Sequence, residues 1–109
     1  MKKNYLIIVS EDPLEFPATR RAGDLALQLK QCGHEVALFL VQNGVLASRA
    51  NASADGLSPI FASAIEVLAD DFSLRERGIE FNELRAGVAP APIDTVVSRL
   101  AAGWNTLWS

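Results

Sequence analysis

Hydrophobic residues form three short, nearly continuous runs along the chain, at positions 4–10, 35–41 and 65–69. Each run is rich in Ile, Val or Leu and is followed by polar residues or a turn. Runs of this length without a polar face are typical of strands that are covered on both sides of a sheet. We therefore predict three buried strands of a parallel sheet.

Two further segments show the spacing of three and four residues that marks one face of a helix. The first helix is predicted at 18–33, and the second begins near Ile93 and ends at Gly103. Glycine is a natural end for a helix, since it adopts the conformation that often follows the last turn. The predicted apolar faces consist of Ala22, Leu25, Ala26, Leu29 and Cys32 in the first helix, and of Ile93, Val96, Val97, Leu100 and Ala101 in the second.

Shorter segments carry weaker signals. Residues 73–76 match a capping box, in which the Ser73 hydroxyl and the Glu76 carboxylate satisfy each other's unpaired backbone amides. Residues 79–84 alternate weakly and predict a strand, and residues 104–108 predict a last edge strand. Short helical segments are predicted at 45–49 and 57–63, and loops at 51–59 and 87–92.

Strands that alternate with helices require right-handed crossovers, which place helices on both faces of a mostly parallel sheet. Half of the residues are hydrophobic and 21% are charged, as in globular proteins. The sequence therefore predicts one α/β domain over residues 1–109, a three-layer α/β/α sandwich with about five mostly parallel strands.

Charge and hydropathy narrow the functional classes. The formal net charge of −3 and the scattered basic residues argue against a nucleic-acid partner, for which a basic stripe is expected. The first apolar run is too short for the core of a signal peptide, and no run approaches the roughly 20 apolar residues that cross a bilayer. We expect a cytoplasmic protein without a membrane span.

The third predicted strand stops at Asp70 and Asp71, and ligands of open parallel sheets bind beyond the carboxyl ends of strands. Adjacent carboxylates can bind a cation, or divide into an acid and a base when their pKa values separate. The structural alternative is that Asp71 supports the start of the following helix, where negative charge is favourable, and that Asp70 is solvated.

Polar residues also follow the first two strands, and with Asp70 they can line one crevice for a small polar or cationic ligand. The turn after the first strand lacks the glycine pattern of a dinucleotide site, and neither a cofactor nor a metal is predicted. The structural alternative for the same residues is ordinary turn and capping chemistry. The candidate ligand-binding residues are Ser10, Glu11, Asp12, Gln42, Asn43, Gly44 and Arg75, the last for an anion or a partner's carboxylate.

The single cysteine, Cys32, excludes an internal disulfide. It lies on the apolar stripe of the first predicted helix, which predicts a buried packing thiol far from the strand ends. His34 has no nucleophile placed beside it, so a structural or surface role is expected. Trp104 and Trp108 suit either a subunit interface or core packing at a sheet edge.

Three passages together resemble the DsrE/DsrF/DsrH-like family, which includes the Tus sulfur-relay subunits. Residues 33–45, GHEVALFLVQNGV, are similar to its second strand and the following Gly-Val turn. IEVLA at 65–69 and LRERGI at 74–79 are similar to its third strand and next helix, and a C-terminal helix followed by a short strand with Trp also fits. The resemblance covers nearly the whole chain and implies small α/β/α subunits in trimers or hexamers.

Active members of that family carry persulfide sulfur on a cysteine just after the third strand and pass it to a partner cysteine, which requires an accessible thiolate. Counted back from Arg77 and Gly78, this position is Asp70, and a carboxylate cannot hold a persulfide. The leading hypothesis is a non-catalytic, homo-oligomeric subunit that binds a partner or small ligand. The alternatives are a sulfur carrier that uses Cys32 or the cysteine of a relay partner, and a metal-binding or hydrolytic site at Asp70 and Asp71.

Overall fold

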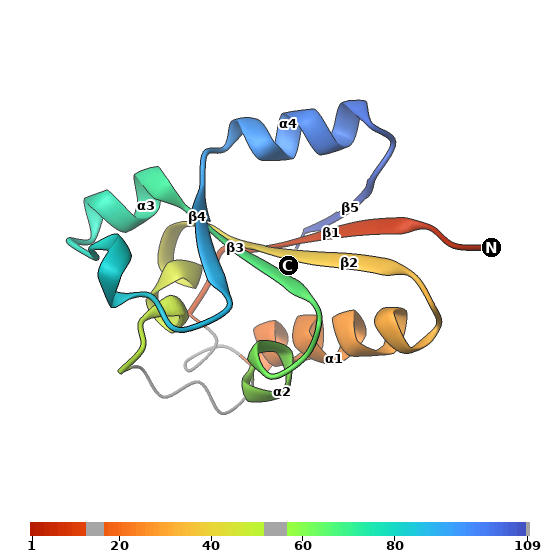
Figure 1. Ribbon diagram of the computed structural model, residues 1–109, viewed down its shortest axis with the longest axis horizontal. Helices are drawn as coiled ribbons and strands as arrows, with labels where there is room; N and C mark the ends of the chain where they lie inside the picture. The colour runs from red at the N-terminus through yellow and green to blue at the C-terminus, as the bar shows by residue number, and fades with distance from the viewer. Residues whose placement is uncertain (13–16, 52–56, 109) are drawn as a thin grey trace.

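The structure, a computed structural model, describes residues 1–12, 17–51 and 57–108. At its centre lies a five-stranded sheet with the strand order β4-β3-β2-β1-β5, in which every neighbouring pair is parallel (Figure 1). The strands are β1 (Asn4–Val9), β2 (Glu35–Leu40), β3 (Glu66–Asp70), β4 (Val88–Ala91) and β5 (Asn105–Trp108).

Helices cover both faces of the sheet, which confirms the predicted three-layer sandwich (Figure 1). One face packs against α1 (Pro17–Gln31), α2 (Ser58–Phe61) and the 3₁₀ helix η1 (Gln42–Ser48). The other face packs against α4 (Asp94–Ala101). Two short helices, α3 (Asp71–Glu76) and η2 (Phe81–Glu83), follow the carboxyl end of β3.

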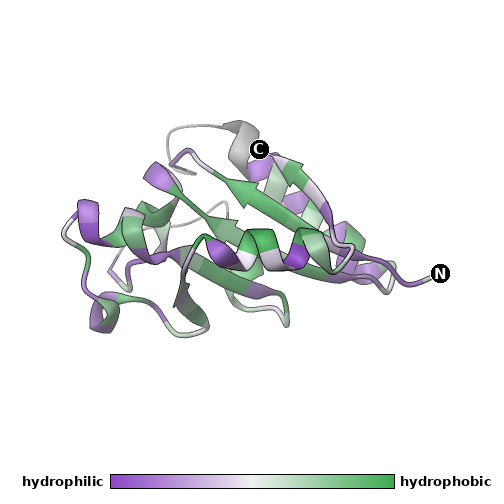
Figure 2. Cartoon of the chain, turned by 90° about the horizontal axis from the view of Figure 1, so that it is seen from above, coloured by the Kyte–Doolittle hydropathy of each residue, from purple (hydrophilic) through white to green (hydrophobic). Residues whose placement is uncertain are grey.

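The two faces are covered unequally. Alternate strand residues such as Leu38 and Leu40 join the larger core under α1, whereas Ala37 and Phe39 join a smaller one under α4. Figure 2, which looks onto α4 and the sheet beneath it, shows hydrophobic residues concentrated in the strands. Apolar side chains stay exposed on this side of the molecule: Val97 and Leu100 within α4, and Ile93 just before it.

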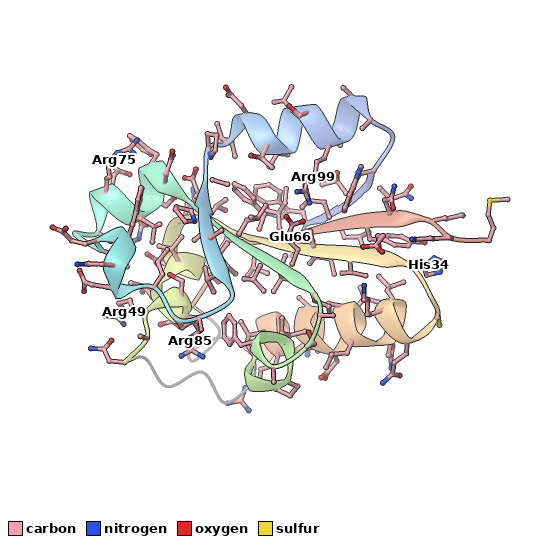
Figure 3. The ribbon with its side chains drawn as sticks, in the orientation of Figure 1. His34, Arg49, Glu66, Arg75, Arg85 and Arg99 are labelled. Atoms are coloured by element: carbon pink, nitrogen blue, oxygen red, sulfur yellow. The ribbon has the colours of Figure 1, made fainter. Side chains whose placement is uncertain are left out.

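A bidentate ion pair fixes α4 to the sheet. Both guanidinium nitrogens of Arg99 donate to the carboxylate of Glu66, at 2.6 and 3.0 Å, and the two side chains point toward each other in Figure 3. The Arg99 guanidinium also lies over the ring of Trp104, 4.7 Å from its centroid. The hydrogen bond that Arg99 donates to Glu66 raises the pKa of Arg99 above its ordinary value. Trp104 is partly buried and packs against the smaller core, whereas Trp108 is 70% exposed.

The fourth strand was predicted in the wrong place. Residues 79–84 contain η2, in which the Glu80 amide donates to the Glu83 carboxylate at 2.9 Å, and the fourth strand is β4, where a loop was predicted. Only Ala91 of β4 is buried, and Pro90 has no amide hydrogen. Such a strand is tolerated at a sheet edge but leaves no hydrophobic pattern in the sequence.

The predicted burial of Cys32 is also wrong, because α1 ends at Gln31 and the thiol is exposed just beyond it. The apolar face of the helix is narrower than predicted: Ala22 and Ala26 are buried, whereas Leu25 is 40% exposed. The other predicted helical segments correspond to η1 and α2. Residues 52–56 of the predicted loop lie outside the described residues.

Candidate functional site

Asp70 forms the junction between β3 and α3, and it caps the helix. Its backbone is extended, with φ −60° and ψ 120°, and its Oδ2 accepts hydrogen bonds from the Ser73 amide at 3.0 Å and the Ser73 hydroxyl at 2.7 Å. The helix therefore begins at Asp71, and the predicted capping box that starts at Ser73 is wrong. The structural alternative that left Asp70 solvated is also wrong, because the residue is only 7% exposed.

Asp71 has different surroundings from Asp70. It lies in the first turn of α3, where the helix dipole favours negative charge, and its carboxylate is 3.9 Å from the Arg75 guanidinium one turn later. The structure thus places the two adjacent carboxylates in separate interactions instead of in one acid–base pair.

The turn after β2 is bonded to α3. The Gln42 amide donates to the Ser73 hydroxyl at 2.9 Å, so a chain of hydrogen bonds runs from Gln42 through Ser73 to Asp70. Gln42 has a φ of 51°, in the left-handed region that non-glycine residues seldom occupy. The side chain of Arg77 donates to Asn43 Oδ1 at 3.1 and 3.2 Å. These bonds hold the ends of β2 and β3 in a fixed relation.

Gly44 passes very close to the end of β1. A Cβ atom on this residue would lie 2.3 Å from the carbonyl oxygen of Val9, which also accepts a hydrogen bond from the Val41 amide at 2.9 Å. Its role in the structure is therefore this close backbone approach.

A cavity of about 310 Å³ lies among the carboxyl ends of the central strands, α3 and α4. Its volume is at the lower end of the range for small-molecule sites. Its hydrophobic lining consists of Ile8, Val41, Phe72, Ile93, Val96 and Trp108, and its polar lining of Gln42, Asp70, Ser73 and Glu76. Among the described residues that line the cavity there is neither a lysine nor an arginine.

One oxygen of Asp70 lacks a partner. Oδ1 is buried and accepts no hydrogen bond from the described residues, although Oδ2 accepts two. A buried, unsatisfied acceptor costs about 1–3 kcal/mol, and more when it is charged. An unpaired carboxylate oxygen beside a cavity is a site where a ligand can supply the missing donor.

The structure brings only some of the predicted residues together. Gln42 and Asp70 line the cavity, but Asn43 binds Arg77 and Gly44 packs on Val9. The candidates that follow β1, namely Ser10, Glu11 and Asp12, are absent from its described lining.

Arg75 lies apart from the cavity on the outside of α3 (Figure 3). It borders a separate, more open groove of about 480 Å³ with Gly78 and Phe81.

Cys32 and His34 lie at the opposite end of the sheet, before β2 begins. His34 is half-buried; its Nδ1 accepts a hydrogen bond from the Lys3 amide at 3.0 Å, and its ring meets that of Tyr5 edge to face (Figure 3). These contacts give His34 a structural role in joining the starts of β1 and β2.

Several lining residues were not identified as site residues from the sequence, among them Phe72, Glu76 and Trp108. Trp108 borders the cavity because β5 pairs with β1 in a register that sets it opposite Ile8. Ile93 and Val96 were assigned only to the core-facing side of a helix. The sequence pattern predicted each of these segments. It does not show the order of the strands, which brings the segments together around one cavity.

The fold and the site define a small α/β protein with a ligand-sized cavity beyond the carboxyl ends of parallel strands. Among the described residues, no group of three His, Cys, Asp or Glu side chains is arranged to hold a metal ion. Within the same residues, no helix has the length and hydropathy needed to span a membrane.

Two solved structures share this fold over almost their whole length. The ychN protein from E. coli superimposes with a TM-score of 0.86 at 17% identity, over 98% of this chain and 99% of that one. The protein of unknown function MTH1491 from Methanobacterium thermoautotrophicum gives a TM-score of 0.81 at 16% identity, with the same coverage. Identities this low show the fold alone. No family model and no curated protein matches the sequence.

Proposed function

We propose that this chain is a DsrE-like subunit that binds a small ligand and does not carry persulfide sulfur. The observation that supports this most is the state of Asp70. The resemblance assigns the carrier cysteine to this position, and here the carboxylate is buried and bonded to Ser73 as a helix cap. The cavity beside it gives such a subunit a place for a ligand.

The proposed subunit acts as a homo-oligomer, a trimer or hexamer by the resemblance. Exposed hydrophobic side chains support this: on α4 Val97 is 65% exposed and Leu100 50%, and nearby around the cavity Phe72 and Trp108 are 57% and 70% exposed. Large apolar side chains grouped on one surface are typical of protein interfaces.

The exposure of Cys32 favours one alternative, a sulfur carrier that passes sulfur to a relay partner. An exposed thiol can react with a persulfide donor, whereas a buried one cannot. Its place at the far end of the sheet from the cavity separates this chemistry from the proposed ligand site.

Intact-protein mass spectrometry after incubation with a persulfide donor tests the proposal. We expect no sulfur on the wild-type chain that passes on to an acceptor thiol. The double variant Cys32→Ser, Asp70→Cys places a thiol at the strand end for comparison. Stable sulfur on Cys32 that transfers to an acceptor thiol would replace the proposal with the alternative. If neither the wild-type chain nor the variant took up sulfur, position 70 would be inaccessible to the donor. The comparison with the cysteine site of the family would then no longer support the proposal.

Size-exclusion chromatography with light scattering tests the assembly. We expect a mass that is a multiple of the 11.8 kDa chain, and a smaller species for Val97→Glu, which puts a charge on the exposed face of α4. Ser98→Glu, also exposed on α4, is the matched control. A monomer at high protein concentration would contradict the oligomeric role while leaving the persulfide result unchanged.

A further inference from the structure

We propose that the cavity at Asp70 binds a small organic ammonium ion with an apolar body, an inference that deepens the proposed ligand-binding function and rests on it. The first argument is charge. Two carboxylates, Asp70 and Glu76, line the cavity, and no basic side chain of the described residues lines it with them. An anionic ligand would therefore meet charges of its own sign.

The arginines of this region are engaged elsewhere. Arg77 donates to Asn43 and to the Ser73 carbonyl oxygen, and Arg75 lies near Asp71. Neither arginine is among the described residues that line the cavity. The carboxylates in the cavity keep their capacity to attract a cation from solution.

The second argument is the unpaired oxygen. Asp70 is more than nine-tenths buried, and its Oδ1 accepts no hydrogen bond from the described residues. A ligand N–H would provide the missing donor, and a charged donor forms the stronger bond to a carboxylate. Because Oδ1 is covered, the lining must yield when the ligand binds. Phe72, Ile93 and Trp108 are the lining side chains that are more than half exposed and so have room to move.

The third argument is the chemical character of the apolar lining. Phe72 and Trp108 are exposed aromatic residues at the cavity, and aromatic faces attract organic cations. Val41 and Val96 form a buried aliphatic wall that suits the hydrocarbon part of such a ligand. A bare Mg²⁺ or Ca²⁺ ion does not fit this largely apolar lining, since each takes about six or more oxygen ligands.

The size and the donor requirement define the ligand class. A volume of about 310 Å³ accommodates a small molecule with a ring or a short chain. Oδ1 needs an N–H donor, so a primary or secondary ammonium fits better than a quaternary one.

Isothermal titration calorimetry with 2-phenylethylamine tests this assignment. Its analogues are 3-phenylpropanoate, which reverses the charge, 2-phenylethanol, which removes it, and trimethyl(2-phenylethyl)ammonium, which keeps the charge without an N–H. We expect binding of the amine with a dissociation constant of about 1 mM or tighter, and binding at least about tenfold weaker for each analogue.

Variants locate the binding. Asp70→Asn keeps a cap acceptor for Ser73 but loses the charge, and we expect it to weaken the amine about tenfold to a hundredfold. Asp71→Asn removes the adjacent carboxylate outside the cavity lining and should leave the affinity within about twofold. Glu76→Gln, at an exposed residue that does not threaten folding, should weaken the amine about two- to fivefold, and less at high salt.

Distinct results overturn distinct statements. Tight binding of the anion or the alcohol without the amine would overturn the cation assignment but leave ligand binding in place. Equal binding of the quaternary ion, or no effect of Asp70→Asn in a folded variant, would overturn the role of Oδ1. No binding of any probe at about 10 mM would overturn the assignment of this ligand class. The persulfide and light-scattering results would still decide the proposed function separately.

Discussion

Gly44→Ala tests whether the close approach of two strand ends determines the geometry of the site. The new Cβ would lie 2.3 Å from the Val9 carbonyl oxygen, well short of the approximately 3 Å that real contacts require. The contacted atom is backbone at the end of β1, a strand that pairs on both sides with β2 and β5. It therefore cannot move aside as a flexible side chain would.

The cost follows from this immobility. Inserted methyl groups in packed interiors destabilise proteins by about 1–3 kcal/mol, and a backbone contact belongs at the upper end. The displaced Val9 oxygen would also weaken its hydrogen bond from Val41. We expect a loss of about 3 kcal/mol in the free energy of unfolding, which lowers Tm by about 10 °C or more in a chain of this size.

Gly33→Ala is the matched control, because it separates backbone strain from steric overlap. Gly33 has a φ of +91° and no atom within 4 Å of its built Cβ, whereas Gly44 lies outside the positive-φ set. Left-handed backbone costs an alanine about 1–2 kcal/mol. Urea unfolding of both variants at equal m-value gives the comparison. A Gly44→Ala variant no less stable than Gly33→Ala would refute the steric argument.

Three further substitutions test individual interactions. Asp70→Ala removes the cap of α3 and should cost about 1–2 kcal/mol in urea unfolding, and an unchanged midpoint would contradict the capping role. Glu66→Gln breaks the ion pair with Arg99, which is partly exposed, and should cost no more than about 1 kcal/mol at low salt; a larger loss would show that the pair does more than join α4 to the sheet. The hydrogen bond from Lys2, with the nearby charge of Lys30, holds the pKa of Glu35 below its ordinary value. This carboxylate therefore favours folding above its unfolded-state pKa, and the contribution disappears as the pH falls through the folded-state pKa. Lys2→Met should raise the Glu35 pKa in an NMR titration, and an unchanged pKa would assign the effect to Lys30.

Local pattern was sufficient to predict β1, β2, β3, α1 and α4, because buried strands and amphipathic helices leave their periodicity in the sequence. It failed for β4, whose exposed residues and Pro90 have no such signal. The start of α3 was ambiguous for a different reason. Asp70 and Ser73 are both good caps, and the Gln42 amide, 31 residues away from Ser73, binds the serine hydroxyl. The local sequence thus leaves the start of α3 open between two residues, and a long-range contact accompanies the start that the structure shows.

The cavity was also predicted only in part from the sequence. The strand-end rule directed attention to Asp70 and Gln42, and both residues line the cavity. The far wall comes from α4 and β5, and their position depends on strand order and register. Neither the strand order nor the register can be obtained from the periodicity of one segment, so most of the cavity lining was not predicted.

The two edge strands of the sheet differ in how well they can pair with a further strand. At β4, Pro90 offers no amide hydrogen to a further strand, whereas the residues of β5 all have one. A neighbouring chain that adds a strand can therefore form a complete ladder only beside β5. A chain paired at β5 keeps only its proline-interrupted β4 border, so strand addition does not continue into a fibre.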